Sequence, residues 1–466
     1  MQNSPITSRH SPHNISNLTL TAVAALLLAA STTNLCAATF SDDNWSSIGN
    51  IQKDGPLPHQ GGGVGPVVTD SSGKLYVGGD FTIAGGVAAT NIAKWNGINW
   101  SALDSGVNGS VGALLAVGNE LYAGGQFTTA GGVSATNIAR WNGSHWSPLG
   151  SGMSSQPYYL GYVGALAMSG SDLYAAGYFT NAGGSPANYI AKWNGSGWSA
   201  LGSGMDDVVQ ALAVSGSNVY AGGHFTTAGG SSANYIAKWN GSSWSALGSG
   251  MDAPVYSLAV MGSDLYAGGY FKTAGGVSAT NIARWDGTDW SPVGAGIHSL
   301  FVGNYSVANV TGLAVSDNDL YAAGNFGVEA SDYGIIAKWN GSSWSALGSG
   351  MNDELGSLAV LGSDLYAGGS FTRAGAKHAE FIAKARVGSS VRSIVATNST
   401  ATIQCSGVSG YQYDAHRTTS LTPPVAWTTI TTNPLYPAPD GTLAFTDTNM
   451  PPGNAFYRAR LLAPTP

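Results

Sequence analysis

Cysteine is scarce in this chain, which contains only Cys36 and Cys405. Residues 18–30 form an apolar run too short to span a bilayer, and the small residues at 36–38 provide a cleavage site. We therefore predict that residues 1–38 are a secretory signal peptide. A lipid anchor on Cys36 is the alternative, although the bulky Leu35 before it is unusual for such a site. After cleavage only Cys405 remains, so no intramolecular disulfide is expected.

Charged side chains are also few, at 9% of residues, and the formal net charge is −7. No run of Lys or Arg offers phosphates an electrostatic grip, so nucleic acid is excluded as a partner. No other apolar segment is long enough for a membrane helix, so no integral membrane segment is expected in the mature chain. The 14 Trp, 21 Tyr and 12 Phe indicate a packed core rather than disorder.

Catalytic and metal-binding motifs are missing as well. The histidines stand alone, without a His-x-His or His-Glu-x-x-His pattern, and neither a Gly-x-Ser-x-Gly elbow nor an Asp-rich calcium loop is present. The pair Asp206-Asp207 is expected to be solvated in a turn. The sequence therefore predicts no metal, no cofactor and no catalytic residue.

What the chain has instead is an internal repeat. Its marker, Leu/Val-Tyr-x-Gly/Ala-Gly-x-Phe, has its tyrosine at seven positions: Tyr76, Tyr122, Tyr174, Tyr220, Tyr266, Tyr321 and Tyr366. Repeats of this length with paired glycines and tryptophans are typical of β-propeller blades. We therefore predict an all-β, seven-bladed β-propeller.

Residues 209–251 represent the expected blade. Residues 209–214 and 219–225 are rich in β-formers, residues 226–234 are Gly-rich and predicted to be a loop, and residues 235–239 and 244–247 flank Asn240-Gly241. Asn-Gly between two such runs is a strong hairpin signal, because both residues tolerate positive φ. Each unit is therefore predicted to be a four-stranded antiparallel meander.

The two ends of the repeat region are complementary. Residues 43–49 match the fourth strand of the unit but follow no strands one to three, whereas the seventh unit departs from the pattern before its fourth strand. We predict that residues 45–48 pair with residues 381–387 and close the ring, which removes an open sheet edge.

A second, small β domain is predicted after the repeat. Residues 391–466 lack the repeat and alternate β-rich runs with proline-rich breaks. The predicted organisation is a signal peptide at 1–38, a propeller at 39–390 and a β-sandwich-like domain at 391–466. The layout of the last domain resembles the short β-sandwich modules that close many secreted bacterial proteins.

The repeat resembles two known families. It is similar to kelch repeats in Gly222-Gly223, Trp244 and Met251, and closer still to the repeats of fungal cortical cell-polarity marker proteins in residues 125–128, 137–139 and 146–152. Both resemblances imply a propeller. They imply little about function, because propellers host binding modules and enzymes alike.

One basic residue recurs before the Trp position of every third strand: Lys94, Arg140, Lys192, Lys238, Arg284, Lys338 and Lys384. An anion-binding ring is one interpretation. The scaffold interpretation is that each alkyl stem covers a neighbouring Trp while the charge reaches solvent.

Candidate ligand-binding residues gather on one predicted face. The connections at 153–162 and 296–308 are longer than elsewhere and carry Tyr158, Tyr159, Tyr162, Phe301 and Tyr305. In a meander they share a face with the loops between strands two and three. The alternative interpretation is that these aromatic residues only cover their own loops.

The residue after Gly-Gly varies while its neighbours barely change, and the kelch resemblance implies that this residue contacts ligand. It is Asp80, Gln126, Tyr178, His224, Tyr270, Asn325 or Ser370 in the successive units. We expect Tyr178, His224 and Tyr270 to form the strongest subsite, for a neutral glycan or peptide. The alternative is that the position is exposed and unselected.

These observations favour a secreted or cell-surface, non-catalytic recognition scaffold that binds an extracellular protein or glycan and is monomeric. An exported carbohydrate-active enzyme, a lyase or hydrolase with its site on the same face, is the alternative. A pair of carboxylates or a Tyr/His pair meeting in the central depression would distinguish the enzyme. A passive structural repeat with a featureless rim is a third interpretation.

Overall fold

The computed structural model describes Phe40 and residues 42–53, 63–155, 161–298, 300–302, 305–316, 319–326 and 336–387, and then 391–397, 400–406, 413–419, 428–431, 435, 442–449 and 456–461. The chain divides into two compact units, of which one is Phe40–Val387 and the other contains the strands beyond Gly388. The predicted signal peptide lies outside the described residues, and the predicted domain boundaries stay predictions. No helix among the described residues is long and apolar enough to cross a bilayer.

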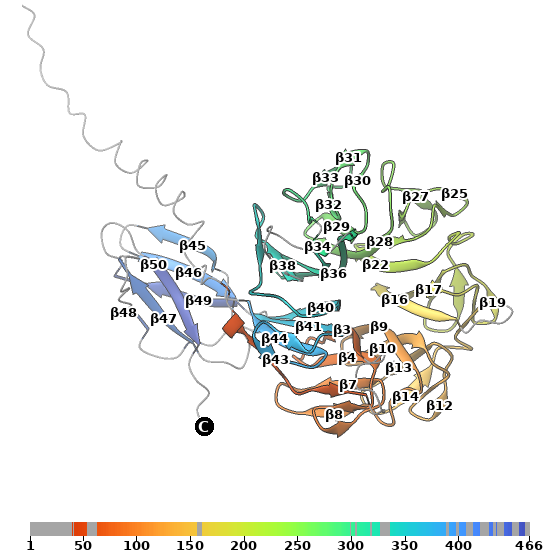
Figure 1. The fold of residues 1–466 in the computed structure, drawn as a ribbon, viewed down its shortest axis with the longest axis horizontal. Helices are drawn as coiled ribbons and strands as arrows, with labels where there is room; N and C mark the ends of the chain where they lie inside the picture. Colours follow the sequence, from red (N-terminus) through yellow and green to blue (C-terminus); the bar gives the residue numbers. More distant parts are fainter. Residues whose placement is uncertain are drawn as a thin grey trace, which may run out of the picture. The chain divides into compact units, whose positions relative to one another are not determined.

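Seven four-stranded antiparallel sheets, the blades, make up the first unit (Figure 1). From the innermost strand outward, blade 1 is β3 (Gly63–Thr69), β4 (Leu75–Asp80), β7 (Ile92–Trp95) and β8 (Trp100–Ala102); blade 2 is β9 (Ser110–Val117), β10 (Glu120–Gln126), β13 (Ile138–Trp141) and β14 (Trp146–Pro148); and blade 3 is β16 (Tyr162–Ser169), β17 (Asp172–Tyr178), β20 (Ile190–Trp193) and β21 (Trp198–Ala200). Blade 4 is β22 (Val209–Ser215), β23 (Asn218–Gly223), β26 (Ile236–Trp239) and β27 (Trp244–Ala246), and blade 5 is β28 (Val255–Met261), β29 (Asp264–Gly269), β32 (Ile282–Trp285) and β33 (Trp290–Pro292). Blade 6 is β36 (Asn309–Ser316), β37 (Asp319–Asn325), β38 (Ile336–Trp339) and β39 (Trp344–Ala346), and blade 7 is β40 (Leu355–Leu361), β41 (Asp364–Gly369), β44 (Ile382–Arg386) and β1 (Trp45–Ser46).

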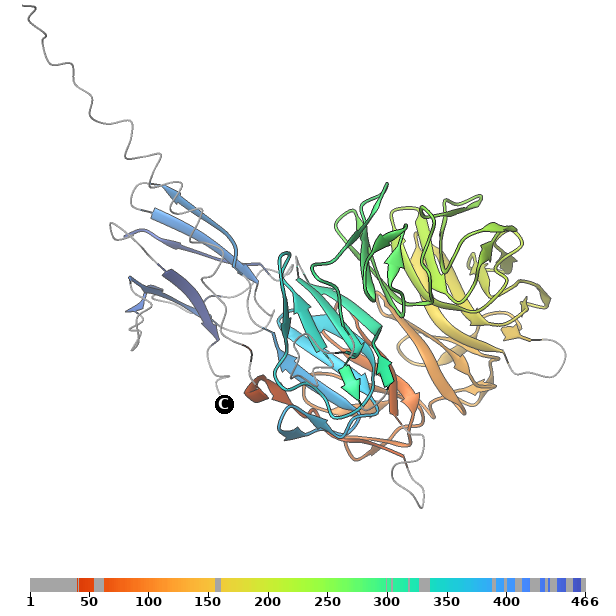
Figure 2. The same cartoon turned by 45° about the horizontal axis from the view of Figure 1, so that its top comes forward.

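The blades form a closed ring (Figure 2). Each innermost strand lies beside the innermost strand of the next blade, and β40 of blade 7 lies beside β3 of blade 1. Strand β1 is the outermost strand of blade 7, where Trp45 pairs with Ala385 and Ser46 with Lys384. An all-β propeller closed by the N-terminal strand is therefore confirmed, although the paired stretch is shorter than residues 45–48.

A ring of indole hydrogen bonds links the blades at their outer strands. The first residue of every fourth strand is a Trp whose Nε1 donates to a carbonyl oxygen just beyond the outer strand of the preceding blade, one residue after its end or, for Ile48, two. The bonds are Trp100 to Ile48, Trp146 to Leu103, Trp198 to Leu149, Trp244 to Leu201, Trp290 to Leu247, Trp344 to Val293 and, across the closure, Trp45 to Leu347. Because Trp45 completes this series, the closing blade uses the same bond as the other six.

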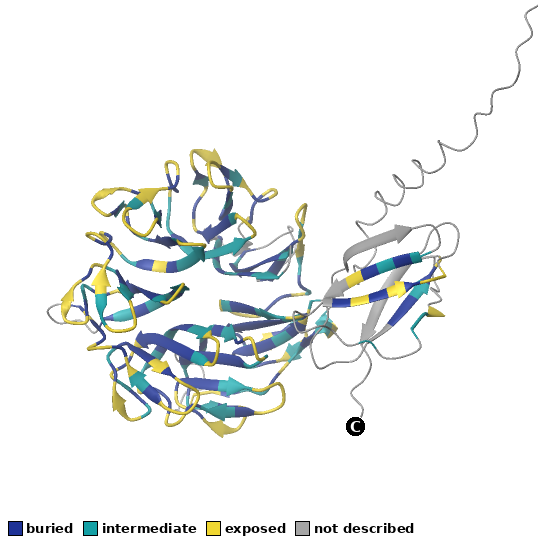
Figure 3. Ribbon diagram, turned by 180° about the vertical axis from the view of Figure 1, so that it is seen from behind, coloured by how far each residue is buried: buried dark blue, intermediate teal, exposed yellow. Residues whose placement is uncertain are grey.

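Aromatic side chains also form the core between blades. The Phe of the marker motif is buried in every blade, as at Phe225 and Phe271, and packs with the marker tyrosine of the preceding blade, as Phe225 does with Tyr174 in one cluster. Buried residues follow the strands, and exposed residues gather at the turns (Figure 3). The large aromatic content of the sequence is thus used in packing, where each ring removes a large apolar area from water.

The predicted loop between strands two and three is a small β-hairpin. In blade 4 it consists of β24 (Thr227–Ala228) and β25 (Ser231–Ser232), joined by Gly229 and Gly230 at φ of 61° and 82°. Five other blades carry the same element: β5 (Ile83–Ala84) with β6 (Val87–Ala88), β11 (Thr129–Ala130) with β12 (Val133–Ser134), β18 (Asn181–Ala182) with β19 (Ser185–Pro186), β30 (Thr273–Ala274) with β31 (Val277–Ser278), and β42 (Arg373–Ala374) with β43 (Lys377–His378). The paired glycines supply the positive φ that the tight turn needs.

The connection between blades holds this hairpin in place. Asp206 Oδ1 accepts hydrogen bonds from the amides of Thr226 and Thr227, both at 2.8 Å, and the neighbouring Met205 bridges to Ala228. Asp252 does the same in blade 5. Asp206 is exposed in a turn, as predicted, and its carboxylate also caps backbone amides of the next blade.

Most of the recurring basic residues are paired with an acid of their own blade. Five of them form ion pairs with an acid on strand two of the same blade: Arg140 with Glu120, Lys192 with Asp172 (2.8 Å), Arg284 with Asp264 (2.6 Å), Lys338 with Asp319 (2.6 Å) and Lys384 with Asp364 (3.1 Å). Their register partner is the marker tyrosine, as in Tyr174 opposite Lys192. Because cross-strand neighbours share a sheet face, each basic residue lies beside the marker tyrosine and also within reach of the acid on strand two. This neutralisation favours a scaffold role over an anion-binding ring.

The marker tyrosines predict how stability responds to alkaline pH. Burial, assisted by Asp70, raises the pKa of Tyr76 to about 12, and burial with a hydrogen bond to Glu120 raises the pKa of Tyr122 to about 12. An unfolded phenol titrates near pH ~10. Because the pKa of each phenol is higher in the folded state than in the unfolded state, the two tyrosines contribute a stabilisation that is complete below about pH 10. This stabilisation is lost as the pH rises through about 12.

We therefore expect the melting temperature to fall steeply over that pH range, and to fall less in the double variant Tyr76→Phe, Tyr122→Phe. Calorimetric melts at a series of pH values measure this. An identical pH dependence in the variant and the parent protein would contradict the assignment.

The second unit contains two three-stranded antiparallel sheets. One has the order β45 (Val391–Thr397), β46 (Thr400–Ser406), β49 (Thr442–Asp447), and the other β48 (Thr428–Thr429), β47 (Tyr413–Thr418), β50 (Phe456–Leu461). Arg417 of β47 donates to Asp447 of β49 at 2.7 Å, so one ion pair joins the two sheets. The prediction of a small β domain agrees with these sheets.

Candidate functional site

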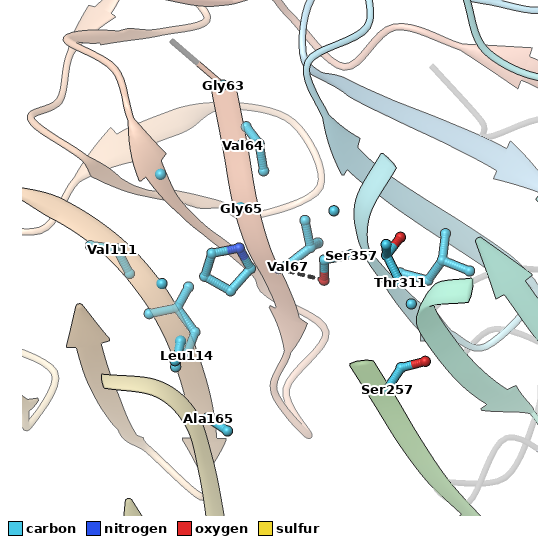
Figure 4. A pocket seen from close by; sticks show the side chains of 18 of the residues that line it. Gly63, Val64, Gly65, Val67, Val111, Leu114, Ala165, Ser257, Thr311 and Ser357 are labelled. Atoms are coloured by element: carbon cyan, nitrogen blue, oxygen red, sulfur yellow. Dashed lines mark hydrogen bonds between the residues drawn. The ribbon is translucent and has the colours of Figure 1, made fainter. Parts of the chain in front are cut away.

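A cavity of about 1080 Å³ lies at the centre of the ring. Its lining comes from the innermost strands of all seven blades, and Figure 4 shows side chains of β3, β9, β16, β28, β36 and β40 around the same space. Ser357 Oγ of blade 7 accepts a hydrogen bond from the amide of Val67 in blade 1 at 3.0 Å, which ties these two walls together. A cavity of this size is in the range of small-ligand sites.

Each innermost strand has a bulge beside this cavity. Pairing with the second strand skips one residue, or two in blade 1, immediately after the first buried residue. The skipped residues are Gly65 with Pro66, Gly112, Gly164, Gln210, Tyr256, Thr311 and Gly356, and all of them line the cavity. Bulges re-aim a side chain and are frequent near binding sites.

Sequence reasoning missed this bulge position. A signal was available, because the residue changes among Gly, Gln, Tyr and Thr while its neighbours stay apolar or small. What the sequence could not supply is the interruption in pairing that turns this residue toward the cavity.

The seven variable positions after Gly-Gly surround the start of the innermost strands. In blades 1 to 3 the strand register pairs Asp80 with Gly63, Gln126 with Ser110 and Tyr178 with Tyr162. In blades 4, 5 and 7 a backbone amide donates to a carbonyl oxygen instead: His224 to Val208, Tyr270 to Pro254 and Ser370 to Glu354. Asn325 pairs with Asn309. Asp80 and Ser370 also line the cavity, so these residues stand at one mouth of it.

Tyrosines give this mouth an exposed aromatic surface. Tyr178 and Tyr270 are 39% and 45% exposed, which is high for large side chains in this fold. The ring of Tyr178 lies 6.1 Å from that of Tyr189, measured between centroids. Tyr189 has φ of 64°, which is unusual for a bulky residue. An exposed tyrosine offers a flat apolar face and a polar hydroxyl to a ligand.

His224 contacts the bulge residue of the next blade rather than Tyr178 or Tyr270. Its ring centroid lies 5.8 Å from that of Tyr256. Burial, with a smaller contribution from Tyr270, raises the pKa of Tyr256. The structure therefore joins His224, Tyr256 and Tyr270 in one group on blades 4 and 5, while Tyr178 belongs with Tyr189 on blade 3.

Tyr162 does not lie on an extended rim loop as predicted. It is the first residue of β16, and its ring occupies the space beside Gly112 and Gly164: a Cβ on Gly112 would lie 2.1 Å from the Tyr162 hydroxyl oxygen. Burial raises the pKa of Tyr162. The Tyr162 ring lies inside the cavity wall because these two glycines, on the innermost strands of adjacent blades, leave room for it.

The other predicted rim aromatics are only partly described. Tyr158 and Tyr159 lie outside the described residues. Phe301 and Tyr305 belong to a hairpin formed by β34 (Leu300–Val302) and β35 (Tyr305–Val307). The long connection before blade 6 thus forms a separate two-stranded element.

Charges at the mouth are sparse and partly compensated. Asp80 forms an ion pair with Lys53, and Asp353 is a further acid of the lining. Across the described part of the chain, no three His, Cys, Asp or Glu side chains converge to hold a metal ion. Hydroxyl, amide and backbone groups provide most of the polarity of the lining.

One family model matches part of the propeller. Residues 66–214 match the model of the Rax2 C-terminal beta propeller domain, and no curated protein matches the chain. The chain is similar to the computationally designed Ika4 protein, with 20% identity over 35% of this chain and 87% of that protein and a TM-score of 0.23. It is also similar to the β-propeller domain of the Trilobed protease from Pyrococcus furiosus, with 12% identity over 63% of this chain, 100% of that domain and a TM-score of 0.31. The family match agrees with the predicted resemblance to cell-polarity marker repeats.

Proposed function

We propose that this protein is an exported, non-catalytic recognition scaffold whose propeller binds a glycan or an extracellular protein at the cavity mouth. The observation that carries this proposal is the exposed aromatic surface formed by Tyr178 and Tyr270 beside the His224–Tyr256 contact. Exposed tyrosines around a central depression are typical of recognition surfaces, which concentrate affinity in a few aromatic anchors. Export and a cell-surface location are part of the proposal.

The His224–Tyr256 contact also bears on the enzyme alternative, a lyase or hydrolase. A general base must lie within hydrogen-bond reach of the proton that it abstracts. The rings of His224 and Tyr256 instead meet in a tilted packing contact, with their centroids 5.8 Å apart. Recognition therefore fits this pair better than proton abstraction does.

The test is a glycan array and a pull-down from culture supernatant, followed by affinity measurement on the ligand found. We expect the triple variant Tyr178→Ala, His224→Ala, Tyr270→Ala to weaken binding by about 2 kcal/mol or more, because truncation of aromatic anchors has effects of this size. The matched control replaces the exposed side chains Ser196, Ser242 and Ser342 at the outer hairpin turns with Ala. Unchanged affinity in the triple variant, with the fold intact by circular dichroism, would place the site elsewhere.

A further inference from the structure

The cavity wall is asymmetric at the bulge position. Blades 4, 5 and 6 carry the side chains Gln210, Tyr256 and Thr311, and Tyr162 fills the wall at blades 2 and 3. Blade 7 has Gly356 and presents bare backbone there, whereas blade 1 has Gly65 followed by Pro66, which also lines the cavity. The rest of the repeat is nearly constant, so the fold itself does not demand this asymmetry.

The glycine at position 356 has no packing reason. The three atoms nearest to a Cβ there would be backbone oxygens at 3.6 Å or more, which is an ordinary contact, and the residue is not among those with positive φ. Gly112 is different, because a Cβ there would collide with Tyr162. The backbone conformation at position 356 therefore does not require a glycine. The effect of having glycine there is to keep one side of the cavity open.

The side chains opposite this opening offer neutral hydrogen-bonding groups. Thr311 Oγ1 donates to the carbonyl oxygen of Leu355 at 2.7 Å, which leaves its lone pairs to accept. Gln210 is exposed and lines the cavity, and its amide both donates and accepts. Tyr256 adds a ring face and a protonated hydroxyl. This set suits a ligand that has hydroxyl groups around apolar ring faces.

We propose that the central cavity binds the end of a neutral oligosaccharide, with Gln210, Tyr256 and Thr311 contacting the sugar and the Gly356 side providing its space. The inference rests on the proposed function, because the cavity opens at the mouth formed by Tyr178, His224 and Tyr270. An extended peptide fits less well, because peptide recognition in a groove uses alternating side-chain pockets or charged partners. Of the two acids in the lining, Asp80 is paired with Lys53, which leaves Asp353 as a single charge for a peptide to meet.

The experiment uses the variant Gly356→Tyr, which places at blade 7 the residue that blade 5 carries naturally. The probes are neutral hexasaccharides of glucose, mannose, xylose and N-acetylglucosamine, with sulfated glycans and neutral peptides as comparison, titrated by calorimetry. We expect a neutral hexasaccharide to bind the parent protein and Gly356→Tyr to lose at least tenfold in affinity. Gln210→Ala, which adds no bulk, is expected to lose about threefold or more. Ser242→Tyr at an exposed turn is the control and should bind like the parent.

Each outcome separates the two proposals. Loss of binding in Gly356→Tyr and Gln210→Ala, with the control unaffected, supports the cavity site. If a hexasaccharide binds but only the mouth triple variant weakens it, the cavity inference falls and the proposed function stands. Preferential binding of peptides or sulfated glycans, or no binding of any hexasaccharide, also overturns the inference, while a protein partner at the mouth would still satisfy the proposed function.

Discussion

Deletion of residues 39–50 is expected to lower the melting temperature of the propeller by about 10 °C. Trp45 is fully buried in blade 7, and truncating a buried Trp alone costs about 3–5 kcal/mol. The deletion also removes Asp42, which accepts hydrogen bonds from the amide and hydroxyl of Ser349, and the carbonyl oxygens of Asp43 and Trp45 that bind Lys377. Trp100 loses its acceptor Ile48 as well.

The matched comparison is Trp45→Ala against Trp146→Ala. Trp146 is also buried, occupies the equivalent place in blade 2 and makes the equivalent indole bond, but its strand follows the third strand of its own blade without a break in the chain. We expect the larger drop for Trp45→Ala, measured by thermal melts followed by circular dichroism. Coincident melts of the deleted and parent proteins would show that this strand does not close the ring.

Replacement of the second glycine of the marker motif is expected to destabilise the propeller by about 3 kcal/mol or more. A Cβ on Gly223 would lie 2.2 Å from the carbonyl oxygen of Val208, the residue just before the adjacent strand β22, and backbone cannot move aside as a side chain can. The same collision occurs at the second glycine of every blade, as at Gly125, where the distance to the Ser110 oxygen is 2.1 Å.

The first glycine of the same pair provides the control. Gly222→Ala is expected to cost less, because a Cβ there meets the side chain of Val255, and blades 3 and 6 carry Ala176 and Ala323 at that place. Urea unfolding of both variants measures the difference. Equal free energies of unfolding for Gly222→Ala and Gly223→Ala would contradict the steric explanation of the motif.

Much of the fold could be predicted because its determinants are local and repeated. Asn240-Gly241 between two β-rich runs predicts a hairpin from φ preferences alone, and the structure has that hairpin between β26 and β27. The unmatched strand at residue 45 predicts closure, because an open sheet edge is unfavourable. The candidate mouth residues could be named for the same reason, since the position after Gly-Gly varies within a constant motif.

The features that sequence reasoning missed depend on contacts between blades or strands. The Gly-rich segment after Phe225 forms a hairpin whose amides are capped by Asp206 of the preceding connection. Lys192 finds Asp172 through strand register, and Tyr162 turns inward because Gly112 of another blade leaves room. None of these partners is adjacent in sequence.

By itself, the sequence determined the number of blades, the four-strand pattern within each and the strand that completes the ring, because repetition and turn chemistry specify them locally. Only the tertiary structure decided which side chains face the central cavity. A bulge in each innermost strand aims Gln210, Tyr256 and Thr311 at that space, and the cavity itself exists only when seven innermost strands are arranged around one axis. The proposed binding surface is therefore a property of the closed ring and of no single repeat.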